Sequence, residues 1–383
     1  MIYWKLSLVL LSVPGLFVGV IVFIGYSSFG SSLSEVDKDR FKSLSYYNAD
    51  KHIFHNRIPD ALKQMRREIF SWGTFLEAFG QGQNRAPKVK LPEVRPNLEE
   101  FTSTDTELKV IWFGHSSFLL NISGKFVLVD PVFSESASPW SFMVRRFQPP
   151  VLKLEELPNV DFVLISHDHY DHLDMKSVKF FKDLDVTFVT PLGVGSHLRG
   201  WGIPEAKIVE KGWWESLELN GLTFTATPAQ HFSGRGVFDD SKTLWASWVI
   251  KSLKHSVYFS GDSGYDVHFK EIGEKLGPFD IAFLECGQYN KKWREVHMFP
   301  EDAIQAYKDL NTKKLFPVHW GMFELSFHPW MEPAERISHL ASTEDIPLII
   351  PKLGEIVDLS STYELVPWWK DDNLYSAEVR YED

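Results

Sequence analysis

The segment SHDHYDHLD at residues 166–174 directly follows the apolar run DFVLI at 161–165 and decides the fold. Its imidazoles and carboxylates are the ligand types that zinc and similar divalent cations prefer. From an extended chain His167 and His169 project the same way, so they can bind one metal ion. Asp171 and His172 follow where the chain turns and can bind a second ion. A polar loop with accidental histidines is the alternative, but so compact a cluster is uncommon.

Three further ligand-type residues stand at the ends of predicted strands. His231 lies in TATPAQHFSGRG, Asp262 lies in VYFSGDSGY between small residues, and His319 lies in KLFPVHWGMF. Each of them alone is more often structural than a ligand. Their occurrence in order after the cluster is hard to ascribe to chance, so we expect them to complete the metal site.

From residue 108 onward the sequence alternates short β-rich runs with amphipathic stretches. Helices are predicted at 175–183, 267–276, 301–310 and 333–341. The pattern predicts sheets covered by helices. The predicted strands are LKVIWF, SFLLNI, KFVLVD, DFVLIS, VTFVT, LTFTAT, WASWVI, SVYFS, DIAFLE and PLIIP.

Over residues 108–351 these ordered motifs resemble the metallo-β-lactamase-fold hydrolases. The resemblance implies an α/β fold, an αββα sandwich of two mixed β-sheets flanked by helices. It also implies two divalent metal ions per chain, with Zn²⁺ as the expected ion. The implied ligands are His167, His169 and His231 for one ion and Asp171, His172 and His319 for the other, with Asp262 bridging.

The flanking sequences look most like the N-acylphosphatidylethanolamine-hydrolysing phospholipase D branch and its lactonase relatives. The resembling stretches are WFGHSSFLL, DPVFSESASP, SHDHYDHLD, PAQHFSGRG, GDSGY, VHMFPEDA and VHWGMF. In that branch an extra histidine lies near the substrate phosphate, a place taken here by His297. This residue is expected to donate a proton or bind phosphate, and a surface role is the alternative.

Two other polar residues are candidates for supporting roles. His115 in FGHSSF is expected either to orient a ligand or bind substrate, or to be a hydrogen-bonded structural histidine. Asp174 is expected to accept a hydrogen bond from a ligand imidazole. The remaining histidines, His197 among them, have no comparable context and are predicted to be ordinary.

The expected reaction is hydrolysis by a hydroxide that two cations produce from a shared water, with Asp262 and His297 in catalytic roles. The first hypothesis is a phosphodiesterase of phospholipase D type that cleaves N-acylphosphatidylethanolamine. The second is a lactonase or other carbonyl-ester hydrolase, which the same ligands would serve. The third is a non-catalytic, membrane-tethered metal-binding protein, which seven filled ligand positions disfavour.

Composition excludes other classes of function. The net charge of −11 has the wrong sign for binding nucleic acid, which disfavours nucleic acid as a partner. The resemblance implies a lipid or another small molecule as the substrate. Cys286 is the single cysteine, which excludes an intramolecular disulfide and a cysteine-rich zinc module. Motifs of serine hydrolases, dinucleotide-binding folds and Walker loops are missing from the sequence.

The N-terminus carries a 19-residue apolar run, Leu6–Ile24, without a charged side chain. Its helical length of roughly 28 Å fits the hydrocarbon core of a bilayer. Because Lys5 precedes the run, we expect a single-pass anchor with the remaining chain on the extracytoplasmic side. A cleaved signal peptide and a buried core helix are the alternatives.

The predicted organisation is an anchor at 1–26, a tether with a helical or irregular extension at 27–100, and a catalytic domain at 101–383. Residues 27–34 are rich in serine and glycine and are predicted to be a flexible tether. Residues 61–79 carry an apolar stripe at helical spacing. That helix is expected to pack on the domain, with the membrane surface as the alternative.

Overall fold

The computed structural model describes residues 25–58, 61–69, 71, 73–74, 84–103, 108–236, 238–371 and 374. The predicted anchor at Leu6–Ile24 and the end of the predicted helix at 61–79 lie outside these residues. Within the part of the chain that is described, no helix has both the length and the apolar character needed to cross a bilayer.

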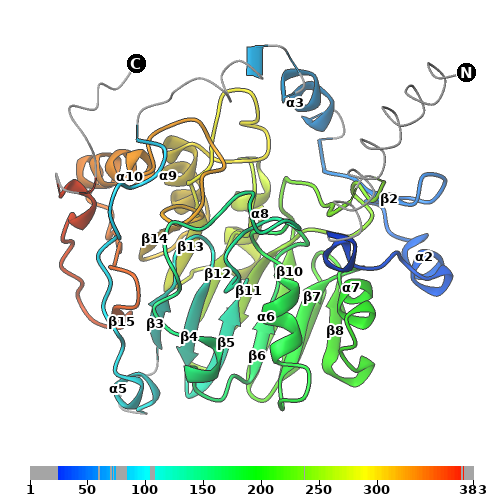
Figure 1. Ribbon diagram of the computed structural model, residues 1–383, viewed down its shortest axis with the longest axis horizontal. Coiled ribbons are helices and arrows are strands. Elements are labelled where there is room, and N and C mark those ends of the chain that lie inside the picture. The colour runs from blue at the N-terminus through cyan, green and yellow to red at the C-terminus, as the bar shows by residue number, and fades with distance from the viewer. Residues whose placement is uncertain are drawn as a thin grey trace, which may run out of the picture.

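Two mixed sheets form the centre of the described structure (Figure 1). The first sheet has the order β15-β3-β4-β5-β6-β7-β8 and the second has the order β14-β13-β12-β11-β10-β9. Each combines antiparallel pairs with parallel ones, the parallel pairs running from β5 to β8 and from β12 to β14. The predicted α/β sandwich of two mixed sheets is therefore confirmed.

Most strands lie where the β-rich runs predicted them. In the first sheet the bounds are β3 Leu108–Trp112, β4 Phe118–Ile122, β5 Lys125–Val129, β6 Phe162–Leu164, β7 Thr187–Pro191, β8 Ile208–Lys211 and β15 Ile356–Asp358. In the second sheet they are β9 Ser216–Leu219, β10 Leu222–Thr227, β11 Ser247–Lys251, β12 Ser256–Phe259, β13 Ile281–Glu285 and β14 Leu315–Val318.

Alternating side chains give the first sheet two apolar faces. Val127 and Val129 of β5 join the core between the sheets, whereas Leu128 joins a separate cluster on the outer face. In β6, Val163 likewise belongs to the outer cluster while its neighbours point inward. Because both faces are covered, these strands are almost continuously hydrophobic.

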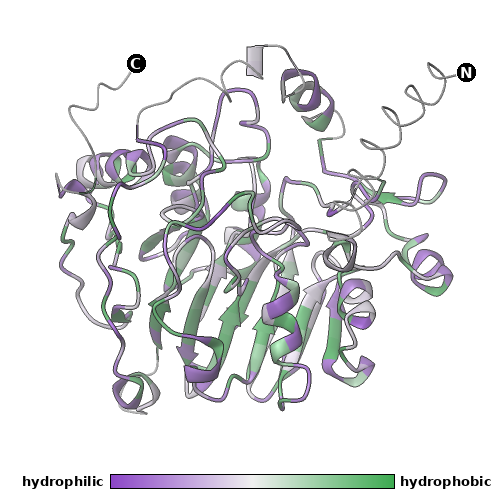
Figure 2. Ribbon diagram, in the orientation of Figure 1, coloured by the Kyte–Doolittle hydropathy of each residue, from purple (hydrophilic) through white to green (hydrophobic). Residues whose placement is uncertain are grey.

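Helices cover the outer faces of the sandwich. Figure 1 shows α6 (Met175–Phe180) and α7 (Gly195–Gly200) in front of the first sheet, and Val178 and Leu198 belong to its outer cluster. On the other side, α8 (His268–Leu276), α9 (Pro300–Asp309) and α10 (Glu332–Thr343) accompany the second sheet, with α9 against β13. Figure 2 shows the hydrophobic residues concentrated in the strands and polar ones on the outer turns of these helices.

The N-terminal segment is folded onto the domain. It contains η1 (Tyr26–Phe29), α2 (Glu35–Phe41), the hairpin strands β1 (Tyr47–Asn48) and β2 (Ile53–Phe54), α3 (Ala61–Ile69) and α5 (Leu98–Thr102). The expectation of a flexible tether at 27–34 is wrong, because Trp201 Nε1 donates to the Ser27 carbonyl at 2.9 Å and Ser31 N donates to His197 Nδ1 at 3.0 Å. Backbone groups of Ser27 and Ser31 make these contacts, and composition cannot reveal them.

The helix α3 packs over the end of the sandwich, as the first of the two alternatives expected. Its Met65 is buried against Trp293 and Val296, and Leu62 packs on the same cluster. This helix therefore contributes to the walls around the residues at the strand ends.

Candidate metal centre and active site

The predicted ligands meet at one edge of the sandwich because they all follow the carboxyl ends of strands. His167 follows β6, Asp262 follows β12 and His319 follows β14. His231 comes after β10 and faces the same space from the antiparallel part of the second sheet. The strand ends of the two packed sheets thus collect side chains that are far apart in the sequence.

The first set of ligand atoms fits a tetrahedral ion. His169 Nδ1 lies 2.9 Å from His167 Nε2 and 3.1 Å from His231 Nε2. Asp262 Oδ2 lies 3.7 Å from the same two histidine nitrogens. Ligands at about 2.0–2.1 Å from a tetrahedral zinc ion must be about 3.3–3.4 Å apart, which matches this spacing.

The second set lies on the other side of Asp262. His172 Nε2 is 3.1 Å from Asp262 Oδ2 and 3.5 Å from Asp171 Oδ2. His319 Nδ1 is 3.1 Å from Asp262 Oδ1. Asp262 therefore contacts both sets, in the position that the resemblance implies for a bridge.

His115 belongs to this second set as well. Its Nε2 lies 2.9 Å from Asp171 Oδ2, and ligand atoms of His115, Asp171, His172 and His319 all lie within 4.8 Å of one another. Of the alternatives for His115, the contact with Asp171 favours orientation of a ligand over a purely structural role.

The backbone of two site histidines is in an unusual conformation. His115 and His319 have φ values of 53° and 70°, in the left-handed region that is costly for non-glycine residues. Their main chains are held together, since His319 N donates to the His115 carbonyl at 3.0 Å and His115 N donates to the Trp320 carbonyl at 2.9 Å. These two backbone hydrogen bonds hold both imidazoles in the site.

Other buried groups orient the ligand imidazoles. Asp130, at the end of β5, accepts from His172 Nδ1 at 2.7 Å and from Ser166 N and Oγ. His231 Nδ1 donates to the Val296 carbonyl at 3.1 Å. Such partners leave the opposite ring nitrogen available for a metal ion.

The electrostatics of the site fit a cation. Asp130, Asp171 and Asp262 converge on His172. Both His172 Nε2 and Asp262 Oδ1 are buried, and neither has a hydrogen-bond partner among the described residues. Burial opposes a charge on His172, yet the carboxylates of Asp262 and Asp171 raise its pKa. Burial also lowers the pKa of His167 and other ligand histidines, which favours the neutral form that binds metal.

His297 lies beside both sets. Its ring centroid is 5.0 Å from that of His231 and 5.2 Å from that of His319. His297 Nδ1 is 3.3 Å from Glu285 Oε1, and the same oxygen accepts from Met298 N at 2.9 Å. Burial opposes the charged form of His297, but the Glu285 carboxylate raises its pKa above the usual value. Burial raises the pKa of Glu285 to about 7.

Asp174 is placed differently from the expectation. It caps the N-terminus of α6, accepting from Lys176 N and Ser177 N, and it also accepts from Ser134 Oγ at 2.8 Å. The carboxylate that accepts from a ligand imidazole is Asp130. A residue two positions after a ligand and directly before a helix is well placed to be an N-cap, and that signal was present in the sequence.

A cavity of about 360 Å³ opens above the two sets. Its floor contains metal-ligand candidates and His297, whereas its walls are largely apolar. Residues of α3 and of the loops after β10, β13 and β14 supply these walls. The apolar lining residues are Met65, Phe232, Trp293, Val296, Leu325 and Phe327.

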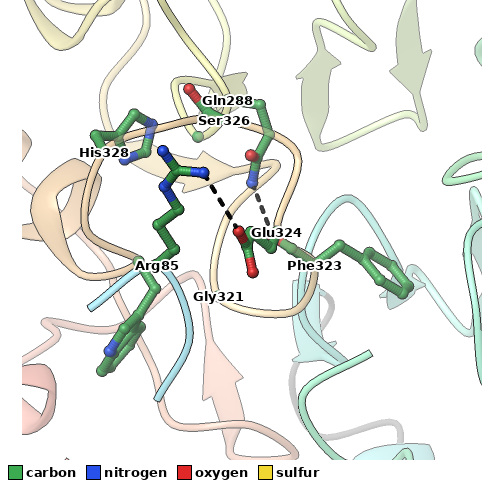
Figure 3. A pocket seen from close by; sticks show the side chains of 9 residues that line it. Arg85, Gln288, Gly321, Phe323, Glu324, Ser326 and His328 are labelled. Carbon is green, nitrogen blue, oxygen red and sulfur yellow. Dashed lines mark hydrogen bonds and ion pairs between the residues drawn. The ribbon is translucent and has the colours of Figure 1, made fainter. Parts of the chain in front are cut away.

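Gln288 connects this cavity to the loop that carries His319. Its Nε2 donates to the carbonyls of His319 and Phe323, and its Oε1 accepts from Leu325 N at 3.2 Å. Figure 3 shows the adjoining small pocket, where Gln288 reaches the loop and Arg85 pairs with Glu324. These contacts hold the loop behind the second ligand set in place.

A family model described as a beta-lactamase superfamily domain matches residues 125–320. This range contains the predicted metal ligands and His297.

Two sequence relatives illustrate the similarity. An uncharacterized protein of Mycobacterium tuberculosis is 44% identical over 74% of this chain and 77% of its own length. An N-acyl-phosphatidylethanolamine-hydrolyzing phospholipase D of Caenorhabditis elegans is 35% identical over 70% of this chain and 81% of its own length.

A solved structure with the same fold is an isothiocyanate hydrolase from Delia radicum gut bacteria. It has 22% sequence identity and a TM-score of 0.53, and the match covers 65% of this chain and 98% of the hydrolase. At this level of identity the comparison supports the architecture alone.

Proposed function

The chain belongs to the beta-lactamase superfamily and is a metal-dependent hydrolase, and from this premise we propose that it is a phosphodiesterase of phospholipase D type. Its proposed substrates are N-acylphosphatidylethanolamine-like lipids, cleaved to phosphatidic acid and an N-acylethanolamine. The observation that carries the proposal is the cavity, which combines a floor of metal ligands with largely apolar walls. A substrate with both a phosphodiester and acyl chains suits this combination.

The proposal includes two divalent ions, with Zn²⁺ as the proposed metal. His167, His169 and His231 would hold one ion, Asp171, His172 and His319 would hold the other, and Asp262 would contact both. Bound there, two cations would lower the pKa of a water and neutralise negative charge that develops at phosphorus.

The protein's own side chains have distinct roles in this proposal. His297 is held by Glu285 at the cavity edge, where a cationic imidazole can bind a phosphate oxygen or give a proton to the leaving alcohol. Phosphodiester cleavage produces a doubly charged product, so this cation helps more there than in the opening of a lactone. Trp293 and Phe327 line the space available to an acyl chain.

We also propose that residues 1–26 anchor the protein in a membrane, with the catalytic domain on the extracytoplasmic side. The apolar run Leu6–Ile24 and the preceding Lys5 support this attachment. An anchored enzyme would meet its lipid substrate in the bilayer.

Hydrolysis in water labelled with heavy oxygen tests the reaction. We expect the label in phosphatidic acid and none in the N-acylethanolamine, because attack is at phosphorus. Mass spectrometry of the products from detergent micelles gives the answer. Efficient opening of simple lactones with the phospholipid left intact would decide for the lactonase instead.

A further inference from the structure

We propose that residues 27–31, here called the strap, position the metal-binding loop 167–172 through His197 and Arg235. His197 is then a positioning residue for the metal centre, although it is no ligand itself. The inference rests on the proposed metal centre but is independent of the substrate.

The first link runs from the strap backbone through His197. Ser31 N donates to His197 Nδ1 at 3.0 Å, and His197 Nε2 lies 3.2 Å from Asp168 Oδ2. An amide N–H can only donate, so Nδ1 must be the acceptor. The neutral ring therefore carries its proton on Nε2 and donates it to Asp168, which gives the chain of hydrogen bonds one direction.

Asp168 transmits this contact to the ligands because it lies between His167 and His169. The carboxylate is buried and also accepts from Thr243 Oγ1 and Gly234 N, each at 2.8 Å. A displacement of Asp168 would move the backbone on both sides and misalign both imidazoles.

The second link is the guanidinium of Arg235. Its Nε and Nη2 donate to the Ser28 carbonyl of the strap at 3.0 and 2.9 Å. Its Nη1 donates to the carbonyls of Asp168 and Leu173 at 2.6 and 2.8 Å. One buried cation thus joins the strap to the backbone at both ends of the ligand loop. If the strap moved away, the buried Nε and Nη2 of Arg235 would lose the Ser28 carbonyl as their acceptor and would be left unsatisfied.

The close approach of the strap depends on two glycines. A Cβ at Gly30, whose φ is 82°, would lie 2.1 Å from His197 Nδ1. A Cβ at Gly200 would lie 1.8 Å from Ser31 Oγ. The strap and the helix α7 therefore fit closely together. A methyl group at Gly30 would displace the strap without any substitution of His197 or Asp168.

Zinc affinity of the full-length protein in detergent, measured by competition with a chromogenic chelator, tests the inference. We expect His197→Phe and Gly30→Ala each to weaken zinc binding about tenfold, the lower end of the range for outer partners of metal ligands. His197→Gln retains a donor toward Asp168 and should recover most of the affinity.

Ser34→Ala, three residues beyond the strap at the N-cap of α2, is the matched control. It removes the bond that Ser34 Oγ accepts from Asp37 N at 3.1 Å and so weakens α2, but it leaves both links intact. This variant should melt at a lower temperature with unchanged zinc affinity.

Wild-type zinc affinity in both His197→Phe and Gly30→Ala would overturn the inference, even if the metal-free variants melted earlier, because the strap would then be structural only. If His197→Phe does not fold, Gly30→Ala decides alone. A wild-type protein that binds zinc normally but leaves the phospholipid intact would contradict the proposed substrate and not the strap.

Discussion

Among the residues that the structure describes, Asp262 is the carboxylate that contacts both ligand sets, so its removal should affect both proposed metal sites. Asp262→Ala is expected to reduce bound zinc from about two ions per chain to one or fewer. The hydrolytic rate should fall by more than about 100-fold, beyond the range for outer partners. Elemental analysis, with circular dichroism to check folding, measures the effect.

Asp266→Asn is a suitable comparison for Asp262→Ala because Asp266 lies in the same loop but pairs with Arg57 at 2.8 Å. Its metal content should match the wild type. Retention of two zinc ions and full activity by Asp262→Ala would show that Asp262 is no bridge.

His297 should contribute to the chemical step more than to metal binding. His297→Ala is expected to lower kcat by a factor of about 10 to 10,000, the usual range for loss of an acid or base. Glu285→Gln keeps the shape of the side chain that contacts His297 but removes its charge, so a smaller decrease in kcat is expected. Kinetics at matched zinc content separate these effects, with His339→Gln on α10 as a histidine outside the cavity lining. Unchanged kcat in His297→Ala would contradict the assignment.

The sequence identified the candidate metal ligands but not the buried residues that contact and orient them. His167, His231 and the other ligand candidates follow apolar runs, and their order along the sequence together with the family resemblance marked them. Asp130 and Glu285 look like ordinary ends of the strands KFVLVD and DIAFLE. Their importance depends on β5 lying beside β6 and on the fold of the loop that carries His297, which local patterns do not reveal. His197 was considered ordinary for the same reason.

At the scale of elements, the loops after β13 and β14 should control which acyl groups are accepted. Phe327→Ala removes apolar surface from the cavity wall beside Trp293. The lost apolar contact with the acyl chain is worth about 1.5–3 kcal/mol of binding free energy, so kcat/KM for long-chain substrates should fall by about 10- to 100-fold. Substrates with short acyl groups should change much less.

Leu253→Ala, in the exposed turn between β11 and β12, provides the comparison for Phe327→Ala. It should leave kcat/KM unchanged for every chain length. An equal loss for short and long acyl groups in Phe327→Ala would show that the wall does not contact the acyl chain.

Helices and strands with a clear hydrophobic pattern were predicted from the sequence, whereas elements with a weak pattern were missed or misassigned. The helix at 301–310 corresponds to α9, and LTFTAT corresponds to β10. PLIIP was predicted to be a strand, but Pro347 and Pro351 lack the N–H groups that a ladder needs, and only a bridge between Leu315 and Leu348 forms. The strand β9 was missed because its SLEL sequence is partly exposed and edges the sheet.

At the scale of the whole molecule, metal binding should stabilise the fold because the ligands come from both sheets. A ligand at 1,000 times its Kd adds about 4 kcal/mol to the free energy of unfolding. For a domain of this size that corresponds to about 5–10 °C in melting temperature. Calorimetry before and after treatment with a chelator should show this difference, and added zinc should restore it. An unchanged melting temperature would argue against metal binding by these ligands.

If the proposed anchor lies in a bilayer, the docked strap would limit how far the catalytic domain can lie from the lipid surface. Only Gly25 and Tyr26 separate the apolar run from the first strap contact at Ser27, a reach of about 10 Å at full extension. With the run in a bilayer, this short connection keeps the catalytic domain close to the membrane, so the domain reaches only nearby lipids. Turnover should then follow the mole fraction of substrate within the surface, so dilution with inert lipid should slow the enzyme while dilution with buffer should not.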